Sequence, residues 1–417
     1  MLKNALTYMT GSVLAQALTL AAIPVLSRLY GPDDFGVFGL FTALLSIIGV
    51  AACLRYALAI PLPKTNRQAA QVLACGAVAL ACVSAVVLLV VIMARGMVAA
   101  ALDAPKLETL LWLLPLSVLG YGVYELSNYW ATRNGRFKAL AASHVTRAAT
   151  VTGTQMAAAA APGGAFGLVI GQLAGQWVTN LVLAWHVLHK DRGVIASGFR
   201  WERICTQARR YRTFAFHGAP QAVLNSVSQT IPVIMLGWFF SPAIVGLYIM
   251  AQRVVSAPMI LISQSLRQVL LPHFSRRRHA GHSLRPVLLR YTTVLAVLGM
   301  PALLVLLFFG DNVFSVVLGQ EWEESGRYAG WLALWLWAEM LSPPATIALT
   351  VLERPRVQMI YEAILLIARI MALTTAAWTN SPEKSIIVFS VVGLFFNLGL
   401  IAIAFFQCLA SEPKKST

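Results

Sequence analysis

Five arginines and three glutamates lie inside long apolar stretches of this 417-residue sequence. A charged side chain at the centre of a bilayer costs about 2.5–3.5 kcal/mol on insertion scales. Each of these residues is therefore expected to have a structural or functional role. Arginines outnumber glutamates by two, a surplus that would suit an anion with about two charges, such as a diphosphate. Arginine suits phosphate because its planar guanidinium donates paired hydrogen bonds and stays charged. The residues are Arg55, Arg147, Arg253, Arg267 and Arg369, with Glu125, Glu339 and Glu362.

Neutral polar residues recur at helical spacing in the same apolar stretches. Such stripes predict surfaces that line water or substrate, because lipid would leave the polar groups without partners. One stripe includes Gln16. Another repeats every four residues through His217, Gln221, Asn225 and Gln229.

Two interpretations of the charged residues stay open. In the first, Arg55, Arg253 and Arg267 face a shared aqueous cavity without acidic partners. In the second, Arg–Glu pairs lock helices together. For coupling transport to an ion gradient, the candidate residues are Glu125, Glu339 and Arg147.

The composition indicates which elements position these residues. Hydrophobic residues make up 58% of the chain and charged residues only 12%, whereas soluble domains carry about 25% charged residues. We therefore predict an all-α polytopic membrane protein. Twelve apolar segments have spanning length: 5–29, 36–60, 68–94, 109–132, 137–160, 163–187, 213–238, 243–273, 291–309, 328–351, 357–379 and 385–408.

Charge in alternate loops predicts the orientation. Of the 32 Lys and Arg residues, 22 fall on one side of the predicted membrane and five on the other. Positive loops stay on the cytoplasmic side, so both termini are expected in the cytoplasm of a multi-pass protein. We predict an N-terminal bundle over 1–190, a basic linker over 191–212 and a C-terminal bundle over 213–417.

An internal repeat supports two bundles. Pro32 and Gly36 recur as Pro242 and Gly246, and Leu54-Arg55 recurs as Leu266-Arg267. In each Pro–Gly copy, the proline is expected to end one helix and the glycine to allow a tight entry into the next. Since six spans separate the copies, the repeat predicts two six-helix bundles related by a pseudo-twofold axis along the membrane normal, an arrangement suited to alternating access.

Common nucleotide-binding, catalytic and metal-binding motifs are absent from the sequence. It contains no GxxxxGK[ST], HExxH or GxSxG pattern, and no two of its five cysteines have CxxC spacing. We therefore predict no catalytic residues, no metal site and no cofactor. The basic residues are spread among loops rather than gathered on one face, which argues against a nucleic-acid partner.

One sequence pattern is shared with a known group of membrane proteins. It comprises Gly11-Ser12, Pro24, residues 28–36, Phe38, Arg55, residues 59–63, and residues 314–322. In these residues the chain resembles the polysaccharide biosynthesis branch of the multidrug/oligosaccharidyl-lipid/polysaccharide exporter superfamily.

The resemblance implies a flippase of the bacterial inner membrane. Its substrate would be an undecaprenyl-diphosphate-linked O-antigen or exopolysaccharide unit, moved by alternating access through a cationic central cavity. Arg55 and Arg267 match the cavity arginines expected in this group, Arg28 matches a position ending the first span, and Arg253 is an addition.

The predicted substrate site therefore comprises Arg28, Arg55, Arg253, Arg267, Gln16, His217, Gln221 and Asn225. Membrane lipid, H⁺ or Na⁺, and a polysaccharide polymerase with its chain-length machinery are the expected partners. Two alternatives remain: a membrane glycosyltransferase of the O-antigen polymerase or ligase type, and a cation-coupled multidrug exporter of the same superfamily.

Overall fold

A computed structural model describes residues 2–410 except 162, 197, 199, 200, 281 and 353. Over this described part the protein is helical and contains no β-strand, which confirms the all-α membrane class. The chain divides into two compact units, which we call unit 1 (Met1–Gly246) and unit 2 (Leu247–Thr417).

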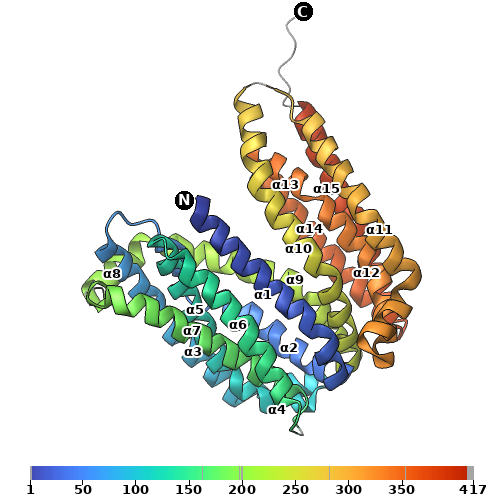
Figure 1. Cartoon of the computed structure of the whole chain (residues 1–417), viewed down its shortest axis with the longest axis horizontal. Coiled ribbons are helices and arrows are strands. Elements are labelled where there is room, and N and C mark those ends of the chain that lie inside the picture. Colours follow the sequence, from blue (N-terminus) through green and yellow to red (C-terminus); the bar gives the residue numbers. More distant parts are fainter. Residues whose placement is uncertain are drawn as a thin grey trace, which may run out of the picture. The chain divides into compact units, whose positions relative to one another are not determined.

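Unit 1 is built on long apolar helices that satisfy their own backbone hydrogen bonds, as lipid requires. Figure 1 shows α1, α6 and α7 side by side. A Cβ added to Gly171 would lie 2.3 Å from the Gln155 side chain, so α7 packs closely on α6. Its helices are α1 (Leu2–Leu29), α2 (Pro32–Gly49), α3 (Asn66–Ala101), α4 (Pro105–Leu110), α5 (Leu114–Arg133), α6 (Phe137–Ala158), α7 (Ala165–Ala196), α8 (Trp201–Arg210) and α9 (Ala219–Phe239).

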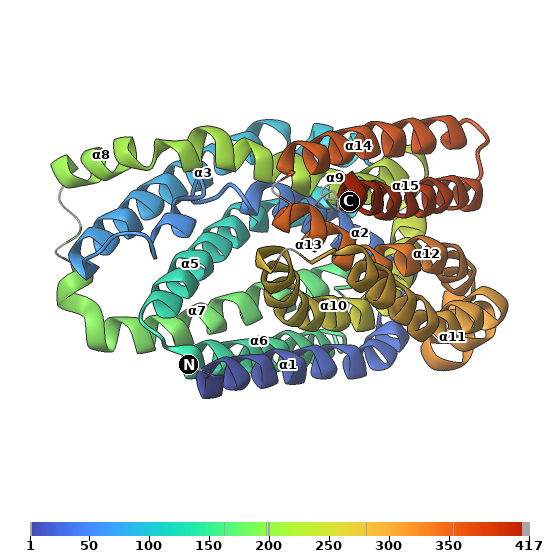
Figure 2. The same cartoon turned by 90° about the horizontal axis from the view of Figure 1, so that it is seen from above.

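In unit 2, α12 packs against both α11 and α15 (Figure 2). The apolar segment 328–351 is divided by a helix break, because α12 ends at Leu341 and α13 begins at Pro343. The helices are α10 (Pro242–His279), which begins at the end of unit 1, α11 (Arg285–Leu318), α12 (Glu323–Leu341), α13 (Pro343–Val351), α14 (Pro355–Ala377) and α15 (Pro382–Ala410).

Each of the twelve predicted segments falls on helix for most of its length. Within the described residues, nine helices are long and apolar enough to cross a membrane. That α6, α10 and α14 also span stays a prediction, as do the pseudo-twofold axis and the proposed bundle boundaries. The division into two compact units puts α9 in unit 1, where Gly237 lies against Leu40 of α2.

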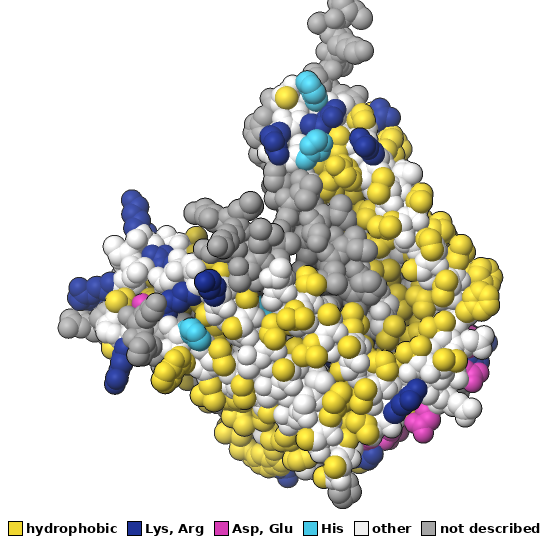
Figure 3. All heavy atoms as spheres, viewed as in Figure 1, with side chains coloured by type: hydrophobic (Ala, Val, Ile, Leu, Met, Phe, Trp, Pro, Cys, Tyr) yellow, Lys and Arg dark blue, Asp and Glu magenta, His cyan; other side chains and the backbone are white. Residues whose placement is uncertain are grey.

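Charge is distributed along the helices of unit 2 as the sequence suggested. Figure 3 shows hydrophobic side chains over its flank, Lys and Arg gathered at one end, and acidic side chains near the other. Such a distribution is typical of a membrane-embedded bundle with a basic cytoplasmic end.

The repeated Pro–Gly motif has a different role from the one expected. Gly36 and Gly246 lie inside α2 and α10, while Pro32 and Pro242 begin these helices. A Cβ on Gly36 would lie 1.6 Å from the Pro242 carbonyl oxygen, and one on Gly246 would lie 1.8 Å from that of Pro32. The absence of a side chain at each glycine therefore lets the proline carbonyl of the other copy approach closely. The expectation that the glycine allows a tight entry into the next helix is wrong.

Candidate functional site

The predicted second span is interrupted before it reaches Arg55. Helix α2 ends at Gly49, the chain turns irregularly, and a short 3₁₀ turn follows at Tyr56–Ala59. Leu54 and Arg55 have φ angles of 44° and 59°, in the left-handed region. For residues with a side chain this backbone costs about 1–3 kcal/mol and persists only when surrounding contacts hold it. The expectation of a continuous span over 36–60 is therefore wrong in its second half.

Arg55 faces an acidic side chain of α5. Its Nη1 lies 3.7 Å from Oε1 of Glu125, and the two side chains are 26% and 12% exposed. The expectation that Arg55 lacks an acidic partner is wrong. However, 3.7 Å exceeds the length of a hydrogen bond. The buried Nε of Arg55 and Oε2 of Glu125 have no hydrogen-bond partner in the described structure, so Arg55 retains capacity to bind an anion.

Helix α5 holds the irregular segment on both sides of Arg55. Before it, the Sγ of Cys53 donates to the Gly122 carbonyl at 3.5 Å. After it, Nη1 of Arg133 donates to the carbonyls of Ile60 and Pro61, at 3.2 and 2.9 Å.

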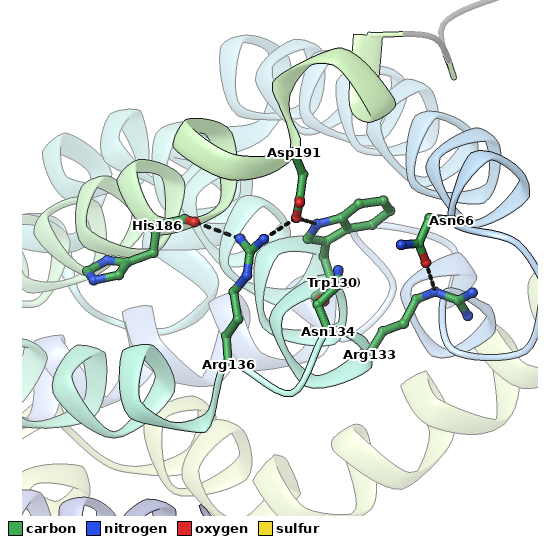
Figure 4. Close-up of polar contacts among 7 residues, drawn as sticks. All are labelled: Asn66, Trp130, Arg133, Asn134, Arg136, His186 and Asp191. Carbon is green, nitrogen blue, oxygen red and sulfur yellow. Dashed lines mark hydrogen bonds and ion pairs between the residues drawn. The ribbon is translucent and has the colours of Figure 1, made fainter.

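Two further bonds anchor the same segment. The Nε of Arg133 donates to Oδ1 of Asn66 at 3.2 Å (Figure 4), and the hydroxyl of Tyr56 donates to the Ala208 carbonyl on α8 at 3.3 Å. These contacts hold the segment in which Leu54 and Arg55 adopt the left-handed backbone.

Arg136, three residues after Arg133, holds a different element. It donates to the His186 carbonyl at 2.6 Å and pairs with Asp191, both on α7 (Figure 4). The Nε1 of buried Trp130 donates to the same carboxylate at 2.8 Å. In the sequence, both arginines count only among the 22 basic residues on the predicted cytoplasmic side. Both fall at the predicted end of a span, and that is the only signal they carry in the sequence.

Arg147 on α6 lies over the ring of Tyr124, with its guanidinium carbon 5.8 Å from the ring centroid. Among the described residues it forms no ion pair with a carboxylate. A guanidinium over an aromatic face is stabilised by the ring quadrupole, and its hydrogen-bond donors remain available.

The polar stripe predicted on the seventh span is accessible. His217 belongs to a π-helical turn, Phe214–Gly218, and this residue, Gln221 and Asn225 are exposed. A Cβ on Gly218 would lie 3.9 Å from the Cβ of Arg55, so this turn lies beside the arginine. Single π-helical turns within helices occur frequently at functional sites.

The remaining predicted site residues of unit 1 lie on α1. Gln16 is half-buried in the middle of this helix, and Arg28 is exposed in its last turn. The structure gives neither residue a charged partner within the described part of the chain.

Unit 2 holds the other predicted residues. Arg253 on α10 is half-exposed and has no ion pair within the described residues, whereas the side chain of Arg267 lies outside them. Glu339 is exposed near the end of α12. Arg369 is 8% exposed, with Trp335 and Phe389 at 5.2 and 5.3 Å from its guanidinium carbon. A cavity shared by Arg55, Arg253 and Arg267 stays a prediction.

Comparison with known sequences identifies one family. A model of the family described as "Polysaccharide biosynthesis protein" matches residues 25–327. The chain is also similar to the teichuronic acid biosynthesis protein TuaB of Bacillus subtilis (strain 168), with 26% identity over 100 residues. That alignment covers 24% of this chain and only 21% of the relative.

Two solved structures share the fold over nearly the whole chain. One is an inward-facing multidrug resistance MATE family transporter of the MOP superfamily, with a TM-score of 0.73, 13% identity, and coverage of 98% of this chain and 96% of the other. The second is the lipid II flippase MurJ in an inward closed conformation, with a TM-score of 0.72, 13% identity, and coverage of 97% and 90%.

Proposed function

Because the chain belongs to the polysaccharide biosynthesis protein family, we propose that it is a flippase for lipid-linked oligosaccharides. Its substrate is an undecaprenyl-diphosphate-linked O-antigen or exopolysaccharide repeat unit, and it moves the unit across the bacterial inner membrane. Both termini face the cytoplasm. The reaction is transport, with no covalent step, by alternating access through a cationic cavity between two bundles.

The unsatisfied Arg55–Glu125 pair is the observation that carries this proposal. At 3.7 Å the carboxylate attracts the guanidinium without saturating it, and the Arg55 Nε has no acceptor. A diphosphate oxygen offers that acceptor together with additional negative charge. In a site shielded from bulk water, such a charge pair is stronger than it would be in solution.

Substrate binding and ion binding are coupled through the same pair. When Arg55 pairs with the diphosphate, Glu125 no longer has the guanidinium as its partner. The carboxylate then becomes the group that binds H⁺ or Na⁺. Glu339 in unit 2 and Arg147 on α6 are the further candidates for this coupling. Released oligosaccharide units then pass to the polymerase and its chain-length machinery.

The test is a transport assay in proteoliposomes with a fluorescent polyprenyl-diphosphate oligosaccharide. The wild-type protein should move the lipid between leaflets, and Arg55→Ala should abolish the movement at equal reconstitution. Elongation of the oligosaccharide during the assay would instead identify a glycosyltransferase. Efflux of a cationic dye, without movement of the lipid, would identify a multidrug exporter, which the fold also accommodates.

A further inference from the structure

One face of α5 combines aromatic and polar side chains. Tyr121, Tyr124, Glu125, Asn128 and Tyr129 follow the i, i+3, i+4, i+7, i+8 pattern of a single helical face. All five are half-buried, whereas Gly122, Leu126 and Trp130, which turn away from this face, are buried. We call the first of these the tyrosine face.

The tyrosine face lies against the arginines described above. Glu125, in its middle, pairs with Arg55, and Tyr124 lies under Arg147. Tyr121 is close enough to Arg55 and Arg147 to interact electrostatically with both guanidinium groups. Tyr129 is close enough to interact with Arg55. On its other side the Tyr121 ring is held by Gly49, where an added Cβ would lie 3.2 Å away.

Two tyrosines of this face have free hydroxyl groups. Among the described residues, the hydroxyls of Tyr121 and Tyr129 form no hydrogen bond, whereas the buried tyrosines Tyr30 and Tyr56 donate theirs to backbone carbonyls at 2.7 and 3.3 Å. A buried or half-buried tyrosine normally finds a partner for its hydroxyl. The hydroxyls of Tyr121 and Tyr129 are therefore available to bond with a bound molecule.

We propose that the tyrosine face binds the sugar portion of the substrate. This inference rests on the proposed function and adds a second binding surface to it. A pyranose ring has flat patches of C–H groups, which pack on aromatic rings, and a rim of hydroxyls, which hydrogen-bond to phenol, carboxylate and amide groups.

The position of Arg55 selects this occupant over a hydrocarbon chain. A diphosphate held by Arg55 is covalently attached to the first sugar, which then lies directly over the tyrosine face. Tyr121 and Tyr129 are eight residues apart, or about 12 Å along the helix, which is longer than one ring and matches two consecutive sugars. A lipid tail would need none of the polar groups of this face.

Binding measurements on purified protein in nanodiscs test the proposal. The probes are a polyprenyl diphosphate carrying the oligosaccharide and the same polyprenyl diphosphate without sugar. The wild-type protein should bind the first more tightly. The double variant Tyr121→Leu/Tyr129→Leu should weaken binding of the sugar-bearing lipid about tenfold and leave binding of the sugar-free lipid within about twofold.

The matched variant Tyr121→Phe/Tyr129→Phe keeps both rings and removes only the hydroxyls. It should weaken binding of the sugar-bearing lipid less than the leucine variant does, and leave binding of the sugar-free lipid unchanged. Equal weakening for both lipids by the leucine variant would show a structural role and overturn the proposal. So would equal wild-type affinity for the two lipids. Failure of the wild-type protein to bind either lipid would instead refute the proposed function, and so would an Arg55→Ala variant that binds both normally.

Discussion

The two copies of the Leu–Arg repeat have different backbones. Leu54-Arg55 lies in a left-handed turn after α2 has ended, whereas Leu266-Arg267 continues the helix of α10, which runs for 38 residues. In unit 1 the segment is held by Gly122, Glu125 and Arg133, all on α5. The same dipeptide therefore lies outside a helix where a neighbouring element supplies partners for its backbone and side chain.

A second contrast concerns how buried arginines are accommodated. Arg55 is partly exposed and lies near a carboxylate, while Arg369 is buried and lies against the rings of Trp335 and Phe389, which also contact each other. The first arrangement can exchange its partner for another anion. In the second, the charge lies against ring faces, whose quadrupole stabilises it.

The largest expected effect follows from this contrast. Replacing Arg55 with alanine should weaken binding of a polyprenyl diphosphate at least tenfold, since a charged hydrogen bond is lost. Arg55→Lys should recover part of the affinity, because a lysine keeps the charge but loses the guanidinium fork. The measurement is a binding isotherm in nanodiscs. Full affinity in Arg55→Ala would remove the functional distinction between the two arginines.

The reciprocal glycines should behave alike, because the two copies are equivalent at this point. Gly36→Ala and Gly246→Ala each place a methyl group against a proline carbonyl, and overpacking of this kind costs about 1–3 kcal/mol. Both variants should lower the thermal unfolding midpoint in detergent by similar amounts. A much larger effect at one of them would show that the copies differ here too.

Arg133 and Arg136 provide a matched pair on the same helix end. Arg133→Ala should weaken diphosphate binding severalfold, because it releases the segment that carries Arg55. Arg136→Ala should lower thermal stability and leave the affinity unchanged, since its side-chain bonds to His186 and Asp191 hold α7. Parallel thermal and binding curves on both variants are required. Equal affinities in the two would show that the turn at Arg55 is held without Arg133.

The smallest effect is expected at Glu125. Glu125→Gln keeps the shape of the side chain and removes the charge that competes for Arg55. Diphosphate affinity should therefore rise a few-fold while the transport rate falls, because the coupling group is lost. Binding and proteoliposome transport, measured on the same preparation, check the two changes. An unchanged transport rate would exclude Glu125 as the coupling group.

Residue order alone determined the membrane class, the approximate helix positions, the basic loops and the resemblance to the family. These properties depend on hydropathy and charge over windows of about 20 residues, which are local.

Only the tertiary structure decided how the candidate site is assembled. Arg55 and Glu125 are 70 positions apart, and no sequence spacing indicates that they meet. The left-handed turn at Leu54-Arg55 and the bonds of Arg133 likewise depend on the packing of α5 against the end of α2. A strained backbone is stable only when distant groups compensate for it, and their positions are a property of the folded chain rather than of any window of its sequence.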